Sequence, residues 1–288
     1  MANVLDIRRR IRSVKSTQQI TRAMKFVAAA KLRKAQERMF LARPYSHRMI
    51  KVLSSLASRV ETVTHPLLEI REEKFVELVV ITGDKGLCGA FNSNILRSAV
   101  DFLEREKTEQ KNLQLNLVGR KGRDFFRRRQ YRIRTETIQL SAAVTFQQAS
   151  SLADSIIEGY TSGNTDAVYL LFNEFKSVMQ QRIIIQKMLP IQRIAEEEKG
   201  DLHTEYIYEQ DPQQILSSLL PRYVATQVFH ALIESVAAEQ AARMTSMEAA
   251  TKNAGEMIDY LTLTMNRARQ ASITKELIEI VSGANALQ

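Results

Sequence analysis

The stretch QQILSSLLPRYVATQVFHALIESVAAEQAARMTSMEAATKNAGEMIDYLTLTMNRARQASITKELIEIVS, residues 213–282, contains one proline, Pro221, and one glycine, Gly255. The first sixty residues contain no glycine and one proline, Pro44. An α-helix as long as the first stretch extends over roughly 105 Å, which is too long for it to fold back into a globule. Because two such stretches flank a middle region of different character, we predict two long terminal helices that pack on each other.

Apolar and small residues recur in both stretches with the three- and four-residue spacing of a coiled-coil seam. In the first helix the row is Val4, Ile7, Ile11, Val14, Gln18, Thr21, Lys25, Ala28, Leu32, Ala35, Met39, Ala42, Ser46, Met49, Leu53 and Leu56. In the last helix it is Ile233, Ala237, Gln240, Met244, Met247, Thr251, Ala254, Ile258, Leu261, Met265 and Ala268, and the register then slips to Ile273, Leu277 and Ile280. Small seam residues such as Ala28 and Ala254 bury little apolar area, so we expect weak self-pairing that depends on a surrounding partner. Because the row continues past Pro44, we expect this proline to kink the helix rather than end it.

The middle of the chain has the pattern of a sheet. Strands are predicted at 75–82, 113–118 and 166–175, and helices at 92–107 and 145–162. Strands that alternate with helices of this length are typical of a parallel α/β sheet. The run QRIIIQKML, residues 181–189, is predicted as an edge strand that ends at Pro190.

The charge of the chain is unevenly distributed. The formal net charge is +9, but residues 1–60 hold fifteen Lys and Arg residues against Asp6 and Glu37, a net charge of +13 (15 − 2). Residues 213–288 hold six basic and seven acidic residues and are nearly neutral. The positive field therefore belongs to the first helix, which either attracts an acidic surface or is a solvated face.

The composition limits the class of protein. With 288 residues, 44% of them hydrophobic and 25% charged, the chain is a folded protein of one or two domains. It has no apolar run long enough for a transmembrane helix, and its N-terminus lacks the apolar stretch of a secretory signal, so we expect the mature chain to begin here. The single cysteine, Cys88, excludes an internal disulfide, and the four histidines show no metal-ligand spacing. We predict no metal and no cofactor.

The glycine-rich turn GDKGLCG, residues 83–89, is the obvious candidate for a nucleotide site, because such a turn can hold phosphate at the start of the next helix. It lacks the Gly-Lys-Ser/Thr ending of a P-loop and the spacing of a dinucleotide-binding turn. Tight turning of the backbone is the favoured interpretation. Cys88 is interpreted as a packed small residue rather than a nucleophile, because no base is marked beside it.

Four longer segments carry a family resemblance: IRSVKSTQQITRAMKFVAAAKLRKAQ (11–36), GDKGLCGAFNSN (83–94), LPRY (220–223) and ARMTSMEAATKNAGEMIDYLTLTMNRARQASITKELIEIVSGANAL (242–287). Together with Asp6-Ile7-Arg8 they resemble the gamma subunits of F-type ATP synthases, in matching order over essentially the full length. The resemblance implies an α/β fold in which N- and C-terminal helices form a long antiparallel coiled coil beside a middle Rossmann-like domain without its nucleotide. The expected segments are 1–60 and 212–288 for the helices and 61–211 for the domain.

The resemblance also implies a role and partners. Gamma subunits turn inside a hexamer of alternating alpha and beta subunits, driven by ion flow through the membrane ring of c subunits, and their asymmetry changes the conformation of each catalytic beta subunit in turn. We therefore expect a non-catalytic rotor that contacts alpha, beta and epsilon subunits and the c-ring. Because the chain has neither the extra middle segment nor the cysteine pair of the chloroplast form, and no transit peptide, we expect a peripheral subunit on the cytoplasmic side of a bacterial inner membrane.

Family roles carry over to eight positions. The expected partner contacts are Arg8, Arg9, Arg12, Met24, Arg269, Gln270, Thr274 and Glu276. The arginines belong to a basic track, and Met24 matches the contact with an acidic beta-subunit loop, although it is also a neighbour of the seam. The four C-terminal residues match a polar patch that holds a beta-subunit loop, with a solvated face as the alternative. The apolar residues 280–287 are expected in a hydrophobic sleeve of the hexamer.

Two hypotheses from other classes remain open. A basic coiled coil with an α/β domain can bind nucleic acid, although few aromatic residues lie among the basic ones to stack on bases. A phosphate-binding enzyme that uses residues 83–89 predicts that the isolated chain binds ATP. A rotor subunit is expected to bind none alone.

Overall fold

The computed structural model describes residues 4–59, 65–138, 144–191 and 212–285, which belong to two compact units. The first, here called the terminal unit, combines Met1–Ala28 with Arg243–Gln288. The second, the sheet unit, spans Ala29–Ala242. The long helices α1 and α5 are each divided between the two units, with one segment in each unit.

The two terminal helices are continuous, as the sequence predicts. Helix α1 spans Val4–Arg59, with Pro44 inside it, and helix α5 spans Pro212–Asn285, with Pro221 inside it. Pro44 therefore does not end its helix. Every described residue of the α1 seam row is buried or half-buried, and so is every α5 seam residue up to Ala268. The seam spacing thus identified the packed sides of both helices.

The sheet unit contains a five-stranded sheet in the order β3-β2-β1-β4-β5. Its elements are η1 (Pro66–Leu68), β1 (Phe75–Ile81), α2 (Phe91–Thr108), β2 (Asn112–Val118), α3 (Arg120–Arg127), β3 (Ile133–Thr137), α4 (Phe146–Thr161), β4 (Ala167–Phe175) and β5 (Gln181–Leu189). Strands β1 to β4 are parallel, and β5 is an antiparallel edge strand. The predicted parallel α/β sheet and its edge strand are confirmed.

Each face of the sheet has its own apolar core, because the side chains of a strand alternate between faces. On one face, Leu78 and Leu117 pack with Ile95 of α2 and Phe126 of α3. On the other face, Val79 of β1 packs in a cluster with α4 and with segments of both long helices. Helix α1 contributes Met49, and α5 contributes Leu216, Leu220, Val224, Ala225, Val228, Ala231 and Leu232. Strands that are buried on both faces read as continuous apolar runs, which is why β1 and β4 were predictable.

The sequence analysis missed helix α3 and strand β3. Seven of the sixteen residues from Gly119 to Arg134 are arginines, so this stretch has no clear apolar period. Strand β3 lies at the edge of the sheet, and each of its residues is half-buried, so the alternation that marks a strand is weak. Long-range packing and pairing with β2 determine both elements.

A close backbone approach fixes the start of α3. Gly119 has φ +96, and a Cβ atom at this position would overlap the carbonyl oxygen of Thr82. The Thr82 hydroxyl accepts a hydrogen bond from the Gly122 N–H at 2.9 Å and donates one to the Val118 carbonyl at 3.0 Å. The ends of β1 and β2 are thereby joined to the first turn of α3.

Candidate functional site

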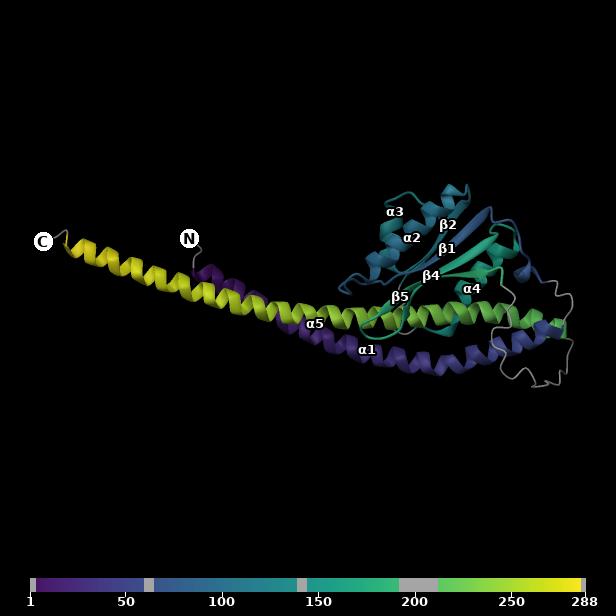
Figure 1. The fold of residues 1–288 in the computed structure, drawn as a ribbon, viewed down its shortest axis with the longest axis horizontal. Coiled ribbons are helices and arrows are strands. Elements are labelled where there is room, and N and C mark those ends of the chain that lie inside the picture. The colour runs from purple at the N-terminus through teal and green to yellow at the C-terminus, as the bar shows by residue number, and fades with distance from the viewer. Residues whose placement is uncertain (1–3, 60–64, 139–143, 192–211, 286–288) are drawn as a thin grey trace. The chain divides into compact units, whose positions relative to one another are not determined.

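In the terminal unit, α1 and α5 lie side by side and antiparallel (Figure 1). The hydroxyl oxygens of Thr21 and Thr251 are 2.8 Å apart, and the Gln18 amide donates to the Thr251 carbonyl at 3.4 Å. One turn further along, Lys25 Nζ lies 2.5 Å from Glu248 Oε1. Polar side chains thus hold much of this contact, as the diluted apolar seam predicts.

Helix α5 extends past the first described turn of α1. Counted antiparallel from the Thr21–Thr251 contact, Val4 lies opposite about residue 268 (251 + 17), where the half-buried seam ends. Ile273, the first residue of the predicted slipped register, is 50% exposed. Among the residues that the structure describes, the predicted slip therefore does not continue the seam.

Large apolar side chains are exposed on both helices of the terminal unit. On α1 they are Leu5, Ile20, Phe26 and Val27, and on α5 they are Met257, Tyr260, Leu263, Ile273, Leu277, Ile278, Ile280 and Val281. Scattered exposed leucines are ordinary on a folded protein, but a helix segment lined with such residues marks a contact surface. This surface continues to Val281, and residues 286–287 of the predicted sleeve contact lie outside the described residues.

The predicted arginine track lies on the surface of α1. Arg8, Arg9 and Arg12 are exposed, and Arg9 Nη1 is 3.7 Å from Asp6 Oδ1. Met24 is half-buried beside the seam. The three guanidinium groups lie within a little more than one turn, so they form one positively charged surface.

The predicted polar patch lies on the extended part of α5. Arg269, Gln270, Thr274 and Glu276 are all exposed. The Thr274 hydroxyl donates to the Gln270 carbonyl at 2.9 Å, and Glu276 accepts from the Ser272 hydroxyl at 3.2 Å. These bonds are local to the helix, so the polar groups face solvent with room for a partner.

The glycine-rich loop, residues 83–89, forms hydrogen bonds with neighbouring residues of the sheet unit. The Gly83 N–H donates to the Asn92 side-chain oxygen at 2.9 Å, and the Arg120 N–H donates to Asp84 at 2.9 Å. Cys88 is buried, with its Sγ 3.2 Å from the Asn92 amide nitrogen. Tight turning and a packed cysteine are the interpretations that this geometry favours.

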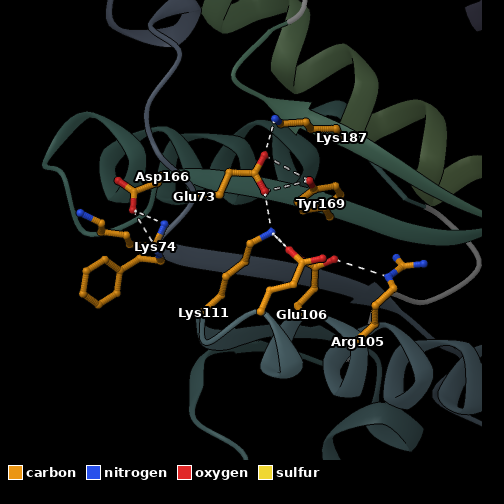
Figure 2. Close-up of polar contacts among 10 residues, drawn as sticks. Glu73, Lys74, Arg105, Glu106, Lys111, Asp166, Tyr169 and Lys187 are labelled. Atoms are coloured by element: carbon orange, nitrogen blue, oxygen red, sulfur yellow. Dashed lines mark hydrogen bonds and ion pairs between the residues drawn. The ribbon is translucent and has the colours of Figure 1, made fainter.

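A group of ion pairs in the sheet unit joins residues that are distant in sequence (Figure 2). Glu73 accepts from Lys187 at 2.6 Å, from Lys111 at 3.2 Å and from the Tyr169 hydroxyl at 3.2 Å. Lys111 also contacts Glu106 at 2.7 Å. Sequence reasoning missed this group because only the sheet topology brings its members together.

The electrostatics of the group follow from its geometry. Burial alone would raise the pKa of Glu73, but hydrogen bonds from Lys187 and Lys111 outweigh it and hold the pKa below its ordinary value. Burial and the neighbouring Glu73 carboxylate raise the pKa of Tyr169 to about 12. Because each charge has an opposite partner, the group fastens β4, β5 and the segments that precede β1 and β2 rather than performing acid–base chemistry.

The described residues contain neither a metal-ligating group nor a membrane-spanning helix. No three His, Cys, Asp or Glu side chains among them are placed to hold a metal ion. Within the same residues, none of the helices combines the length and apolar character needed to cross a bilayer. The large apolar side chains exposed on the terminal helices point to a protein that works through contacts with partners.

Comparison with known proteins identifies the family. A family model described as ATP synthase matches residues 3–287. The ATP synthase gamma chains of Desulforamulus reducens and Solibacter usitatus are each 50% identical to this chain, over 288 and 292 residues, with both chains fully covered. The chain belongs to the ATP synthase family, among its gamma chains.

Solved structures give the same result for the fold. The central stalk and c-ring of the Tetrahymena thermophila mitochondrial ATP synthase contain a chain with a TM-score of 0.59 and 27% identity, matched over 80% of this chain and 99% of that one. A chain from the Euglena gracilis mitochondrial ATP synthase has a TM-score of 0.69 and 20% identity, over 99% and 94% respectively. The predicted combination of terminal helices and a Rossmann-like sheet is confirmed.

Family membership also decides between the classes of function. A gamma chain is a central-stalk subunit, and the catalytic sites of the complex lie on other subunits. The hypotheses of a nucleic-acid-binding protein and of a phosphate-binding enzyme are therefore set aside. Arg8, Arg9, Arg12, Met24 and the polar patch on α5 stay predicted partner contacts.

Proposed function

We propose that this chain is the rotating shaft that couples ion flow through a membrane c-ring to conformational change in catalytic beta subunits. The observation that carries the proposal is the terminal unit: two antiparallel helices with a partly polar seam and large apolar side chains facing outward. A self-contained coiled coil would bury such side chains. A surrounding hexamer of alpha and beta subunits accounts for their exposure, because it covers them without requiring one fixed angle.

The basic surface of α1 is proposed to face acidic loops of the beta subunits. Arg8, Arg9 and Arg12 are exposed, and Met24 further along the helix is half-buried. Electrostatic attraction at a solvated surface is long-ranged and weakly directional, so it can act at many rotor angles. Attraction of this kind between the arginines and acidic loops allows the helix to rotate while the contact persists.

The polar patch on α5 is proposed to hold a beta-subunit loop at one stage of the cycle. Arg269 is a hydrogen-bond donor without an acceptor function, and Glu276 is an acceptor when ionised, so the patch can bind both kinds of backbone group. Directional bonds of this kind favour one rotor angle over others. The apolar residues beyond the patch are proposed to turn against an apolar sleeve.

The proposal extends to organisation and location. In this proposal the expected helix segments 1–60 and 212–288 provide the shaft and the expected segment 61–211 provides the domain, and the chain meets the epsilon subunit and the c-ring. Bacterial gamma chains at 50% identity support membership of a bacterial membrane-associated complex, and we propose a peripheral place on the cytoplasmic side of its inner membrane.

The test is reconstitution. The chain is expected to co-purify as a single copy with each hexamer of alpha and beta subunits, and its deletion is expected to abolish ATP synthesis driven by an ion gradient. The isolated chain is expected to bind no ATP in a titration. A complex that synthesises ATP without the chain would overturn the proposal.

A further inference from the structure

The carboxyl edge of a doubly wound sheet normally binds ligands where the strand order reverses, because loops diverge there and leave a crevice. In this sheet the chain moves outward from β1 through β2 to β3 and then returns to the other side of β1 with β4. The reversal therefore lies between the ends of β1 and β4, beside Gly83 and Phe175.

Helix α5 places a buried carboxylate at this edge. Glu234 Oε2 accepts the Phe175 N–H at 2.9 Å, and Glu234 Oε1 lies 3.4 Å from His230 Nε2. Glu234 is only 2% exposed. A buried carboxylate requires polar partners, so the hydrogen bond from the Phe175 N–H restricts the position of the side chain.

A second carboxylate of α5 lies beside the end of β1. A Cβ atom built on Gly83 would come within 3.0 Å of the Glu239 carboxyl group, so the glycine leaves the room that this side chain occupies. The Gly83 N–H is bound by Asn92. Side chains of this chain thus accept hydrogen bonds from the backbone N–H groups of Gly83 and Phe175 at the crevice. Helix α5 occupies the place where a ligand binds in other proteins of this architecture.

Apolar packing around the contact specifies position less sharply. The residues of α5 near Glu234 include Ala231, Ala237 and Ala238, each at most 1% exposed, beside the larger Leu232 and Ile233, at 2% and 4% exposed, which also pack the helix in place. Alanines let a helix approach closely but provide few side-chain projections that oppose sliding or rotation of the helix. A directional hydrogen bond to a charged acceptor opposes both motions.

We propose that Glu234 is a positioning residue for rotary coupling, which fixes α5 against the carboxyl edge of the sheet so that the sheet domain and the shaft turn without slipping. The inference rests on the rotor function proposed above. In this inference the crevice holds the connection between α5 and the sheet rather than a ligand.

The test compares Glu234→Ala with Glu234→Gln in the complete ATP synthase in membrane vesicles. Glutamine keeps an oxygen for the Phe175 N–H, whereas alanine leaves that N–H buried and without an acceptor. Hydrogen exchange of the Phe175 amide in the alanine variant is expected to accelerate by roughly tenfold. The number of protons pumped per ATP hydrolysed is expected to fall as slipping becomes accessible, while the rate of ATP hydrolysis is retained and glutamine restores most of the coupling.

Controls separate the possible failures. Glu256→Ala, at an exposed position of the same helix, is expected to pump normally. If Glu234→Ala does not assemble, Glu234→Asp decides, because it keeps the charge but withdraws the carboxylate by one methylene, and it is expected to slip. Normal coupling in whichever variant assembles, with fast Phe175 exchange, overturns the proposal. Loss of the rotor function itself is distinguishable, because then even the unaltered chain would support no pumping.

Discussion

The sheet unit and the terminal unit differ in how far they bury their large apolar side chains. In the sheet unit Leu78, Val168 and Ile156 are fully buried by other parts of the same chain. In the terminal unit Leu277 is 58% exposed and Phe26 is 61% exposed. Since burial of apolar surface is the main stabilising contribution to folding, the sheet unit draws its stability from contacts within the chain, whereas the terminal unit leaves apolar surface available to partners.

The charged groups of the two units differ in the same way. Glu77 is fully buried, and its Oε2 lies 2.6 Å from Arg134 Nη1, while its Oε1 accepts from the Asn116 amide at 3.2 Å. The Lys25–Glu248 pair of the terminal unit is solvated, with the Glu248 side chain 59% exposed. The Glu77–Arg134 pair therefore constrains the fold of the sheet unit, whereas the Lys25–Glu248 pair contributes little to the stability of the terminal unit.

The largest expected effect comes from breaking the buried pair. Glu77→Ala leaves the Arg134 guanidinium without its buried partner and should lower the free energy of unfolding by about 3–5 kcal/mol. Urea unfolding of the isolated chain, followed by circular dichroism, measures this change. The matched change in the terminal unit, Glu248→Ala, should cost about 0–1 kcal/mol. Equal losses for the two variants would contradict the proposed difference between the units.

A slightly smaller contrast is expected from apolar truncation. Ile156→Ala in α4 opens a cavity in a closely packed core and should lower the free energy of unfolding by about 2–5 kcal/mol. Leu277→Ala in α5 removes a side chain that is already in water and should change it by less than about 0.5 kcal/mol. Thermal and urea unfolding of the isolated chain compare them. A large loss for Leu277→Ala would show that the end of α5 is packed within this chain.

The same contrast explains what the sequence predicts well. The seam of the terminal helices was predictable because the spacing of residues such as Ile7 and Ala254 reports directly which side of a helix is buried. Strands β1 and β4 were predictable because burial on both faces makes their sequences continuously apolar. Strand β3 was not, because a half-buried edge strand carries little such information.

Long-range polar contacts could not be predicted from spacing at all. Glu234 contacts the backbone of Phe175, which lies 59 residues earlier in the chain, and a hydrogen bond to a backbone N–H leaves no mark on the identity of the donor residue. Glu73 and Lys187 are brought together by strand pairing alone. The predicted partner contacts Arg8 and Thr274 were assigned by family resemblance, because spacing within one chain carries no information about the surface of another.

Acid should affect the sheet unit through Glu73. The pKa of this carboxyl is lower in the folded chain than its ordinary value, so folding is stabilised above the ordinary pKa and this stabilisation is lost as the pH falls through the folded-state pKa. Glu73→Gln should therefore lower stability at neutral pH and show a shallower decline of stability in acid. Urea unfolding of both proteins from pH 7 down to about pH 3 measures the difference. Parallel pH profiles would show that the contacts with Lys187 and Lys111 do not stabilise the ionised form.

The smallest effect on folding, and the clearest effect on partners, is expected from the arginine surface of α1. Replacing Arg8, Arg9 and Arg12 together by glutamine should change the free energy of unfolding by less than about 0.5 kcal/mol, because the three side chains are exposed. Association with the alpha and beta subunits should become slower at low salt. It should also become less dependent on salt, because exposed charges are screened beyond about 10 Å at 0.1 M ionic strength.

The sheet unit offers a matched control for this last experiment. Arg120, Arg128 and Arg132 are also exposed, so their replacement by glutamine removes the same charge from a different surface. If the net charge of the chain alone governs association, the two triple variants should slow assembly equally. If the positive field of α1 is specific for an acidic partner surface, only the α1 variant should lose its salt dependence, and stopped-flow association at two ionic strengths distinguishes these outcomes. The second result is expected, because the excess charge of residues 1–60 exceeds that of the whole chain.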